Sequence, residues 1–126
     1  MIPFVNDAEM EAVLSAAREA GARSASYIPL RLPLEVKYLF REWLQEHYPL
    51  KAEHVMSLVQ QMRGGRDNDP VFGSHMRGQG EFAHVLRRRF EIACRRLDLN
   101  VGERPALETR HFKLPSTSGD QFSLGL

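Results

Sequence analysis

The sequence feature that most constrains the fold is a single strand-like segment, residues 25–32, in a chain whose other periodic segments are helical. A lone strand leaves its backbone N–H and C=O groups without ladder partners, and sheets need neighbouring strands to be stable. Pro29 removes one donor, which disfavours a central position paired on both sides. Residues 27–32 should therefore form a strand at an edge. Either it pairs with a second copy of the chain, or the chain is a piece of a larger protein. We favour the second arrangement.

Four segments carry apolar residues at helical spacing. The first follows Asn6, a good N-cap residue, and ends at Gly21, which favours a left-handed terminus. The second starts in the turn at Pro33 and stops at Pro49, and the others span 51–62 and 81–97. The expected buried residues are Met10, Val13, Leu14, Val36, Leu39, Phe40, Trp43, Leu44, Val55, Leu58, Val59, Met62, Phe82, Val85, Leu86, Phe90, Ala93, Cys94 and Leu97. The fold class is therefore mainly α (α+β), with about four helices and one strand.

Composition sets the remaining limits. With 126 residues, 43% hydrophobic and 26% charged, the chain has the size and composition of one folded domain. No run approaches the roughly 20 apolar residues that span a bilayer, and no signal peptide is visible, so we expect no membrane partner and a cytoplasmic location. The single cysteine, Cys94, excludes an intrachain disulfide and an iron–sulfur site built from this chain's cysteines alone. On an apolar helix face, it is expected to be a buried structural thiol.

The most distinctive polar feature is a glycine-rich loop, residues 63–80, in which Arg63, Arg66 and Arg77 stand beside glycines. Backbone amides and guanidinium groups in such a loop could converge on phosphate. On the last helix Arg88, Arg95 and Arg96 can share one polar side, which would suit a nucleic-acid backbone. The alternative is that the glycines only make turns and the arginines are solvated.

Other chemistry is weakly supported. The five histidines, His47, His54, His75, His84 and His111, do not form an i, i+4 metal pair with a catalytic carboxylate. The sequence has no phosphate-binding P-loop motif and no nucleophile elbow.

Several segments together resemble one protein family. They are residues 2–7 (IPFVND), the AREAGA helix end, residues 27–36 (YIPLRLPLEV), residues 62–80 (MRGGRDNDPVFGSHMRGQG) and residues 87–100 (RRRFEIACRRLDLN). The chain is similar over nearly its whole length to the C-terminal part of bacterial radical S-adenosylmethionine proteins related to spore photoproduct lyase. In that family, strands before this region form a partial (β/α) barrel, and three cysteines bind a [4Fe–4S] cluster that cleaves S-adenosylmethionine.

The resemblance implies a division of this chain into three parts. Residues 1–33 would be the last βα portion of the incomplete barrel, 34–100 a helical C-terminal extension, and 101–126 a flexible tail. Cofactor contacts would fall at Ile2, Pro3, Leu30 and Arg31, and Phe4 stands where the family's turn has glycine. The cluster cysteines are absent, so the chain would be a fragment, not catalytic alone. It would need the missing N-terminal barrel half. The parent would act in radical chemistry, with nucleic-acid repair or modification as the expectation.

Two alternatives remain from other functional classes. The chain could be a stand-alone nucleic-acid-binding module, or a small helical adaptor whose tail recruits another protein. The tail, residues 121–126 (QFSLGL), resembles the peptide with which bacterial polymerases and repair proteins bind the sliding clamp. Gln121 would fill a polar pocket, and Phe122, Leu124 and Leu126 would be the apolar anchors.

Overall fold

The computed structural model describes residues 1–70, 76–102, 106 and 108–113. Within these residues a short 3-10 turn, Asp7–Glu9, leads into α1, Met10–Glu19. The other helices are α2, Val36–His47, α3, Ala52–Met62, and α4, Gly80–Arg96. The described part of the chain is therefore mainly helical and contains no strand.

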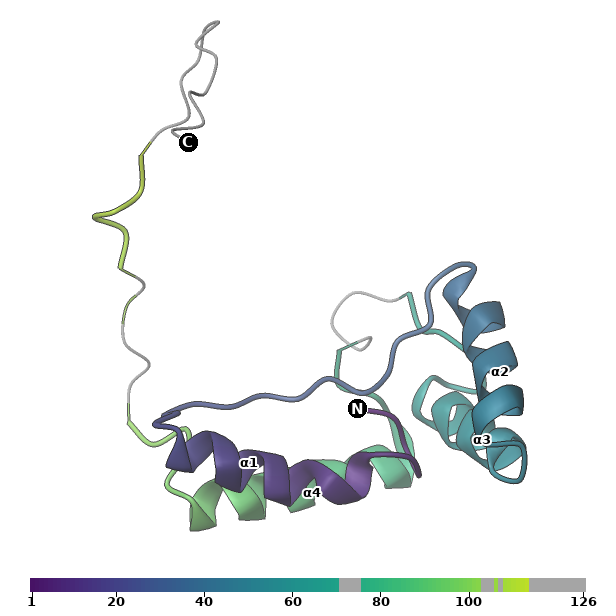
Figure 1. The fold of residues 1–126 in the computed structure, drawn as a ribbon, viewed down its shortest axis with the longest axis horizontal. Helices are drawn as coiled ribbons and strands as arrows, with labels where there is room; N and C mark the ends of the chain where they lie inside the picture. The colour runs from purple at the N-terminus through teal and green to yellow at the C-terminus, as the bar shows by residue number, and fades with distance from the viewer. Residues whose placement is uncertain (71–75, 103–105, 107, 114–126) are drawn as a thin grey trace, which may run out of the picture.

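The helices form two pairs joined by an extended segment (Figure 1). α1 and α4 lie side by side and run in the same direction, and residues 22–33 return along them to the α2–α3 pair. α3 also packs against the start of α4. The helix–extended–helix path brings the amino terminus to the middle of the extended segment.

Three apolar clusters hold this arrangement together. The first lies between α2, α3 and the extended segment, and it contains Leu32, Leu44, Ala52, Val55, Met56 and Val59. The second joins α1 to α4 through Met10, Leu14, Ala93, Cys94 and Leu99. The third joins the ends of α3 and α4 through Met62, Ala83 and Leu86. Ile2 and Leu30, from before position 33, pack into the first cluster, so residues on both sides of that position share one core.

The prediction of a strand over residues 27–32 is wrong for this structure. The segment is extended, but no strand ladder forms among the described residues, because helices α1 and α4 lie along it in place of other strands. Its backbone is held instead mainly by isolated hydrogen bonds from Met1, Asn100 and Arg63.

The helix boundaries agree closely with the sequence pattern. Gly21 adopts φ +96°, and the N–H groups of Gly21 and Ala22 donate to the carbonyls of Arg18 and Ala17, which closes α1 in a Schellman motif. The second helix begins later than expected, at Val36. Leu34 lies in the left-handed region (φ +48°) and separates Pro33 from the helix.

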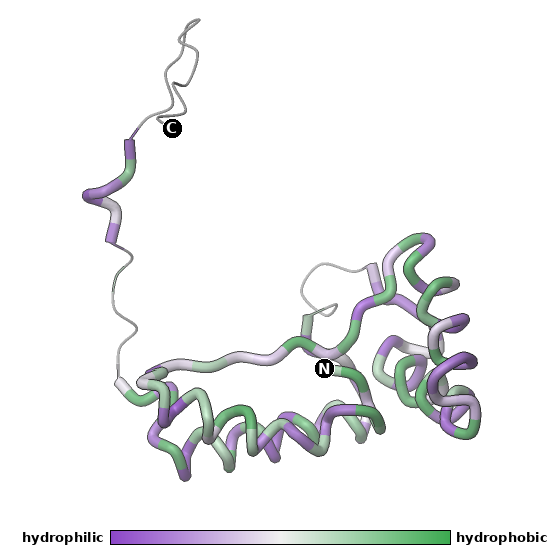
Figure 2. The backbone as a smooth tube through the Cα atoms, viewed as in Figure 1, coloured by the Kyte–Doolittle hydropathy of each residue, from purple (hydrophilic) through white to green (hydrophobic). Residues whose placement is uncertain are grey.

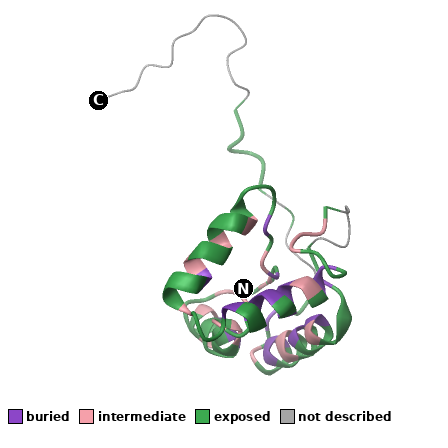
Figure 3. Ribbon diagram, turned by 90° about the vertical axis from the view of Figure 1, so that its right-hand side faces the viewer, coloured by how far each residue is buried: buried purple, intermediate pink, exposed green. Residues whose placement is uncertain are grey.

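Burial follows the sequence pattern best on α3, where all four expected residues are buried. It fails for Val13, Val36, Leu39 and Val85, which are exposed. Each helix contacts the rest of the chain along a narrower stripe than the apolar pattern suggested (Figure 3). Figure 2 shows the resulting mixture of hydrophobic and hydrophilic positions along α2 and α4.

After Asn100 the described residues lie away from the helices (Figure 1) and are exposed. No helix in the described part of the chain is both long and apolar enough to span a bilayer.

Candidate functional site

The extended segment is the centre of the candidate site, and the amino terminus pairs with it. The Met1 ammonium donates to the Ile28 carbonyl at 3.2 Å, and the Leu30 N–H donates to the Met1 carbonyl at 2.9 Å. This pattern is one rung of a parallel β-ladder, in which residue 1 lies opposite residue 29. Pro29 fits this register because the rung uses the groups of its neighbours and not its missing N–H.

Asn100 holds the other end of the segment. Its side-chain amide accepts from the Ala25 N–H at 2.9 Å and donates to the Ala25 carbonyl at 3.0 Å. The Asn100 backbone N–H donates to the Arg23 carbonyl at 2.9 Å. The residue itself is in the left-handed conformation, φ +62°, which asparagine tolerates better than most residues. The sequence analysis missed this role, since nothing local marks Asn100 as the partner of a segment 75 residues away.

Arg63 fastens the segment from a third direction. Only 3% of the residue is exposed, and its Nη2 donates to the carbonyls of Pro29 at 3.0 Å and Leu30 at 2.8 Å. Burial lowers the pKa of the Arg63 guanidinium, and the nearby Asp69 opposes this shift. The structure thus places Arg63 inside the protein and not on a solvent-facing phosphate-binding surface.

The turn at residues 2–7 positions the amino terminus. Asn6 Oδ1 accepts the Ile2 N–H at 2.8 Å, and the Asp7 carboxylate accepts the Phe4 N–H. Phe4 adopts φ +61°, a conformation that favours glycine. Side-chain acceptors thus hold a tight turn in which a bulky residue takes a glycine-like backbone.

The four residues expected to contact a cofactor are not gathered at one surface. Pro3 is buried, and Ile2 and Leu30 pack into the cluster beside α2 and α3. Arg31 is exposed, and its Nη1 lies 3.7 Å from the Met76 sulfur. The structure therefore brings Ile2 and Leu30 together in a core, with Arg31 on the outside.

Two clefts adjoin at Tyr27. Both are lined by Ser26, Tyr27 and Phe90, and the rings of Tyr27 and Phe90 lie 4.9 Å apart. The first cleft, about 210 Å³, is mostly apolar and lies toward α1, with Met10, Val13 and Leu14 in its wall. We call it the apolar cleft.

The second cleft is larger, about 370 Å³, and polar. Arg77, Arg87 and Glu91 line it together with Met76 and Asn100. We call it the arginine cleft. Desolvation raises the pKa of Tyr27, while the neighbouring Arg87 guanidinium acts in the opposite direction.

The glycine-rich loop positions Arg77 at this cleft. Gly78 has φ +71°, and a Cβ there would lie 3.3 Å from the Ala83 Cβ, so only glycine fits without displacing α4. The Gln79 N–H donates to the Met62 carbonyl at 2.9 Å and fastens the loop to the end of α3. The repeated Met-Arg-Gly motif thus marks two tight turns that meet at Met62.

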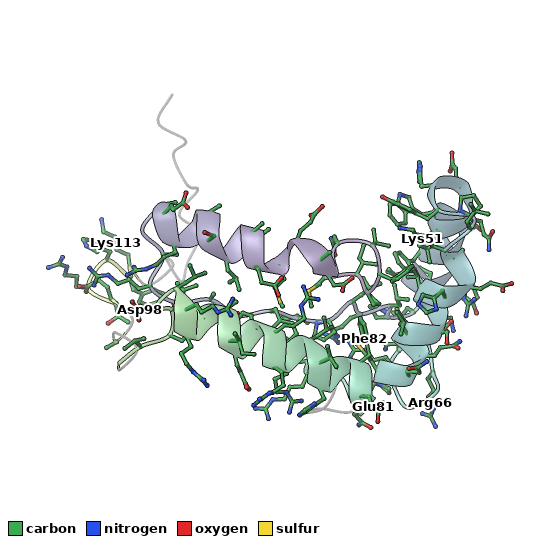
Figure 4. The ribbon with its side chains drawn as sticks, turned by 90° about the horizontal axis from the view of Figure 1, so that it is seen from below. Lys51, Arg66, Glu81, Phe82, Asp98 and Lys113 are labelled. Atoms are coloured by element: carbon green, nitrogen blue, oxygen red, sulfur yellow. The ribbon has the colours of Figure 1, made fainter. Side chains whose placement is uncertain are left out.

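The remaining arginines of the phosphate hypothesis are exposed but do not form one group. Arg88, Arg95 and Arg96 lie on α4, and no ion pair involves them among the described residues. Arg66 lies at the end of the molecule near Glu81, whereas the C-terminal end of α4 near Asp98 is at the opposite end (Figure 4). The sequence analysis did not single out Arg87, although its position in the arginine run was visible.

Arg89, in the same run, has a structural role. It donates to Glu11 Oε1 at 2.8 Å and Oε2 at 2.7 Å, and it contacts Asp7 at 3.4 Å. The hydrogen bond from Arg89 lowers the pKa of Glu11, and Glu11 in turn raises the pKa of Arg89. This network ties the start of α1 to α4.

Cys94 is buried, as expected, and burial raises the pKa of its thiol. No group of three or more potential metal ligands occurs among the described residues. Gln121, Phe122, Leu124 and Leu126, the expected clamp-binding residues, lie outside the described part of the chain. Comparison of the chain with family models, curated proteins and solved structures found no match.

Proposed function

We propose that this chain is the C-terminal part of a radical S-adenosylmethionine protein related to spore photoproduct lyase, with residues 25–32 as a wall strand of its partial barrel. The observation that carries the proposal is the parallel rung between Met1 and the segment around Pro29. Parallel strands joined through a helix are the building unit of (β/α) barrels. Met1, α1 and the extended segment have this order and direction.

The edge beside this rung supports the proposal. In the described part of the chain, the backbone N–H and C=O groups of Ser26 and Tyr27 make no hydrogen bond. They border the apolar cleft, whose wall includes Val13, an exposed residue. A chain segment leading into Met1 and continuing the parallel register would pair with these groups and cover the apolar wall.

The turn at residues 2–7 gives a second line of support. The resemblance aligns Phe4 with a family glycine, and Phe4 has the positive φ that a glycine would adopt without strain. The substituted residue thus keeps the backbone shape of the family turn at a cost of about 1 kcal/mol or more.

The residues of this chain do not fit an iron–sulfur cluster. Such clusters need cysteine thiolates, and the only cysteine, Cys94, is buried in the core between α1 and α4. The contribution proposed for this chain is therefore mechanical: Met1, Arg63 and Asn100 hold the wall strand in place. Cluster and cofactor ligands would come from the missing N-terminal barrel half.

The size and upstream sequence of the native polypeptide test this proposal. We expect an in-frame upstream segment with three clustered cysteines, and intact-protein mass spectrometry should find a native product well above 14.4 kDa. Purified and reconstituted with iron and sulfide, the longer protein should cleave S-adenosylmethionine under reducing conditions. A native product that begins at Met1 would reject the proposal.

A second candidate function, nucleic-acid binding, is favoured by the unpaired cations of α4. Arg88, Arg95 and Arg96 are exposed, and phosphate groups would supply the anions they lack. Replacing all three by alanine should weaken binding to a DNA duplex and reduce the salt slope by about 3. An Arg66→Ala variant serves as the control for loss of a distant exposed cation. Equal binding by the wild type and the triple variant would reject this function.

A further inference from the structure

The arginine cleft combines an aromatic wall, two cations and one anion. The rings of Tyr27 and Phe90 form the wall, Arg77 and Arg87 supply positive charge, and Glu91 is the only carboxylate in the lining. These groups come from three separate parts of the chain: the extended segment, the glycine-rich loop and α4. Gly78 and the Gln79–Met62 hydrogen bond hold the loop against α3 and α4, so the cleft is built by the fold.

Each part of this lining selects a chemical group. Planar heteroaromatic rings stack on tyrosine and phenylalanine. Paired guanidinium groups bind phosphate through charge-assisted hydrogen bonds. A carboxylate accepts hydrogen bonds from an exocyclic amino group, as it does from cytosine N4.

The volume, about 370 Å³, is within the range of small-molecule sites. It suits one ring with one phosphate group and excludes larger assemblies from full burial.

We propose that the arginine cleft binds a nucleotide unit whose base carries an exocyclic amino group. The base lies against Tyr27 and Phe90 with its amino group toward Glu91, and the phosphate lies between Arg77 and Arg87. This proposal goes beyond the barrel assignment and stands independently of it, because every residue involved belongs to the chain described here.

The test is titration calorimetry of the full chain with cytidine monophosphate and uridine monophosphate, which differ at the amino group. We expect one binding site, with the cytidine nucleotide bound about fivefold or more tightly. Inorganic phosphate alone should bind far more weakly than either. Equal affinity for both nucleotides, or no saturable binding of either, would overturn the proposal.

Variants separate the parts of the site. Glu91→Gln should abolish the preference between the two nucleotides, and Arg77→Ala or Arg87→Ala should weaken binding of both about tenfold. Arg95→Ala, an exposed α4 variant outside the cleft lining, is the matched control and should bind like the wild type. Circular dichroism verifies that each variant is folded. If Arg95→Ala weakens binding as much as Arg87→Ala, the ligand lies on the outer face of α4 and the proposal is wrong.

The same nucleotide unit could be free or part of a strand. An eight-residue cytidine oligonucleotide compared with its thymidine counterpart distinguishes these sources. Tighter, salt-dependent binding of the cytidine oligonucleotide than of the mononucleotide would assign the unit to a nucleic acid strand. Equal affinity for the cytidine oligonucleotide and mononucleotide would assign it to a free nucleotide. Loss of the cytidine preference in the oligonucleotide pair would count against base recognition in the cleft.

Discussion

Replacement of Arg63 by methionine should destabilise the protein strongly, because this side chain is buried and serves two backbone carbonyls. The Nη2 donations to Pro29 and Leu30, at 3.0 Å and 2.8 Å, are hydrogen bonds from a charged donor. Such bonds contribute about 1.5–3 kcal/mol each, and removing the donor leaves two acceptors unsatisfied. Relief of the buried charge offsets part of the loss. We expect a net decrease of about 3 kcal/mol in the free energy of unfolding.

Urea unfolding followed by the fluorescence of Trp43, the only tryptophan, measures this change. Hydrogen exchange at the Leu30 amide gives a local readout, because that amide donates to Met1 in the segment that Arg63 holds. Exchange there should accelerate in Arg63→Met. Arg66→Met, an exposed arginine in the same loop, is the control and should change stability by less than about 0.5 kcal/mol. A loss below about 1 kcal/mol in Arg63→Met, or equal losses in both variants, would refute the assigned role.

Three further outcomes are expected. Asn100→Ala should lower the free energy of unfolding by about 1–2 kcal/mol in the same urea assay, because it removes two hydrogen bonds to the extended segment; a change near zero would contradict this. Glu11 has a folded pKa below its unfolded value, so its contribution is full above about pH 4.5 and is lost as pH falls through the folded pKa. The contribution should stay below about 1 kcal/mol since Glu11 is half exposed, and urea midpoints of Arg89→Gln should depend less on pH between about 5 and 3 than those of the wild type. A synthetic peptide of residues 121–126 should bind a bacterial sliding clamp in calorimetry with about micromolar affinity, and a Gln121→Ala peptide that binds equally well would reject the clamp hypothesis.

Local signals in the sequence located the helices well. Gly21 and Pro49 mark helix ends that the structure confirms within one or two residues, because termination depends on nearby backbone geometry. The buried face of α3 was also predictable, since this helix is covered by both α2 and α4. Val13 and Leu39 were not, because their helices contact neighbours along one narrow side.

The candidate site was less accessible to sequence reasoning. Arg63 and Arg66 have the same local setting of glycines, yet one is buried and the other exposed. The difference lies in the position of residues 29 and 30, more than thirty positions away, and only the folded chain decides which guanidinium reaches them. Grouping of Arg77 with Arg87 and Tyr27 has the same origin, because three separate segments must meet before the cleft exists.

The anchoring of the extended segment has a consequence for the order of folding. Its partners Met1, Arg63 and Asn100 are separated from it by 27, 34 and 75 residues. Such distant contacts require closure of long loops, so they form after the local turns of the helices and slow the approach to the native state. The segment should therefore be unstructured in the folding transition state, and Arg63→Met should accelerate unfolding in stopped-flow experiments while leaving the folding rate nearly unchanged. A folding rate that falls in proportion to stability would place this segment in the nucleus instead.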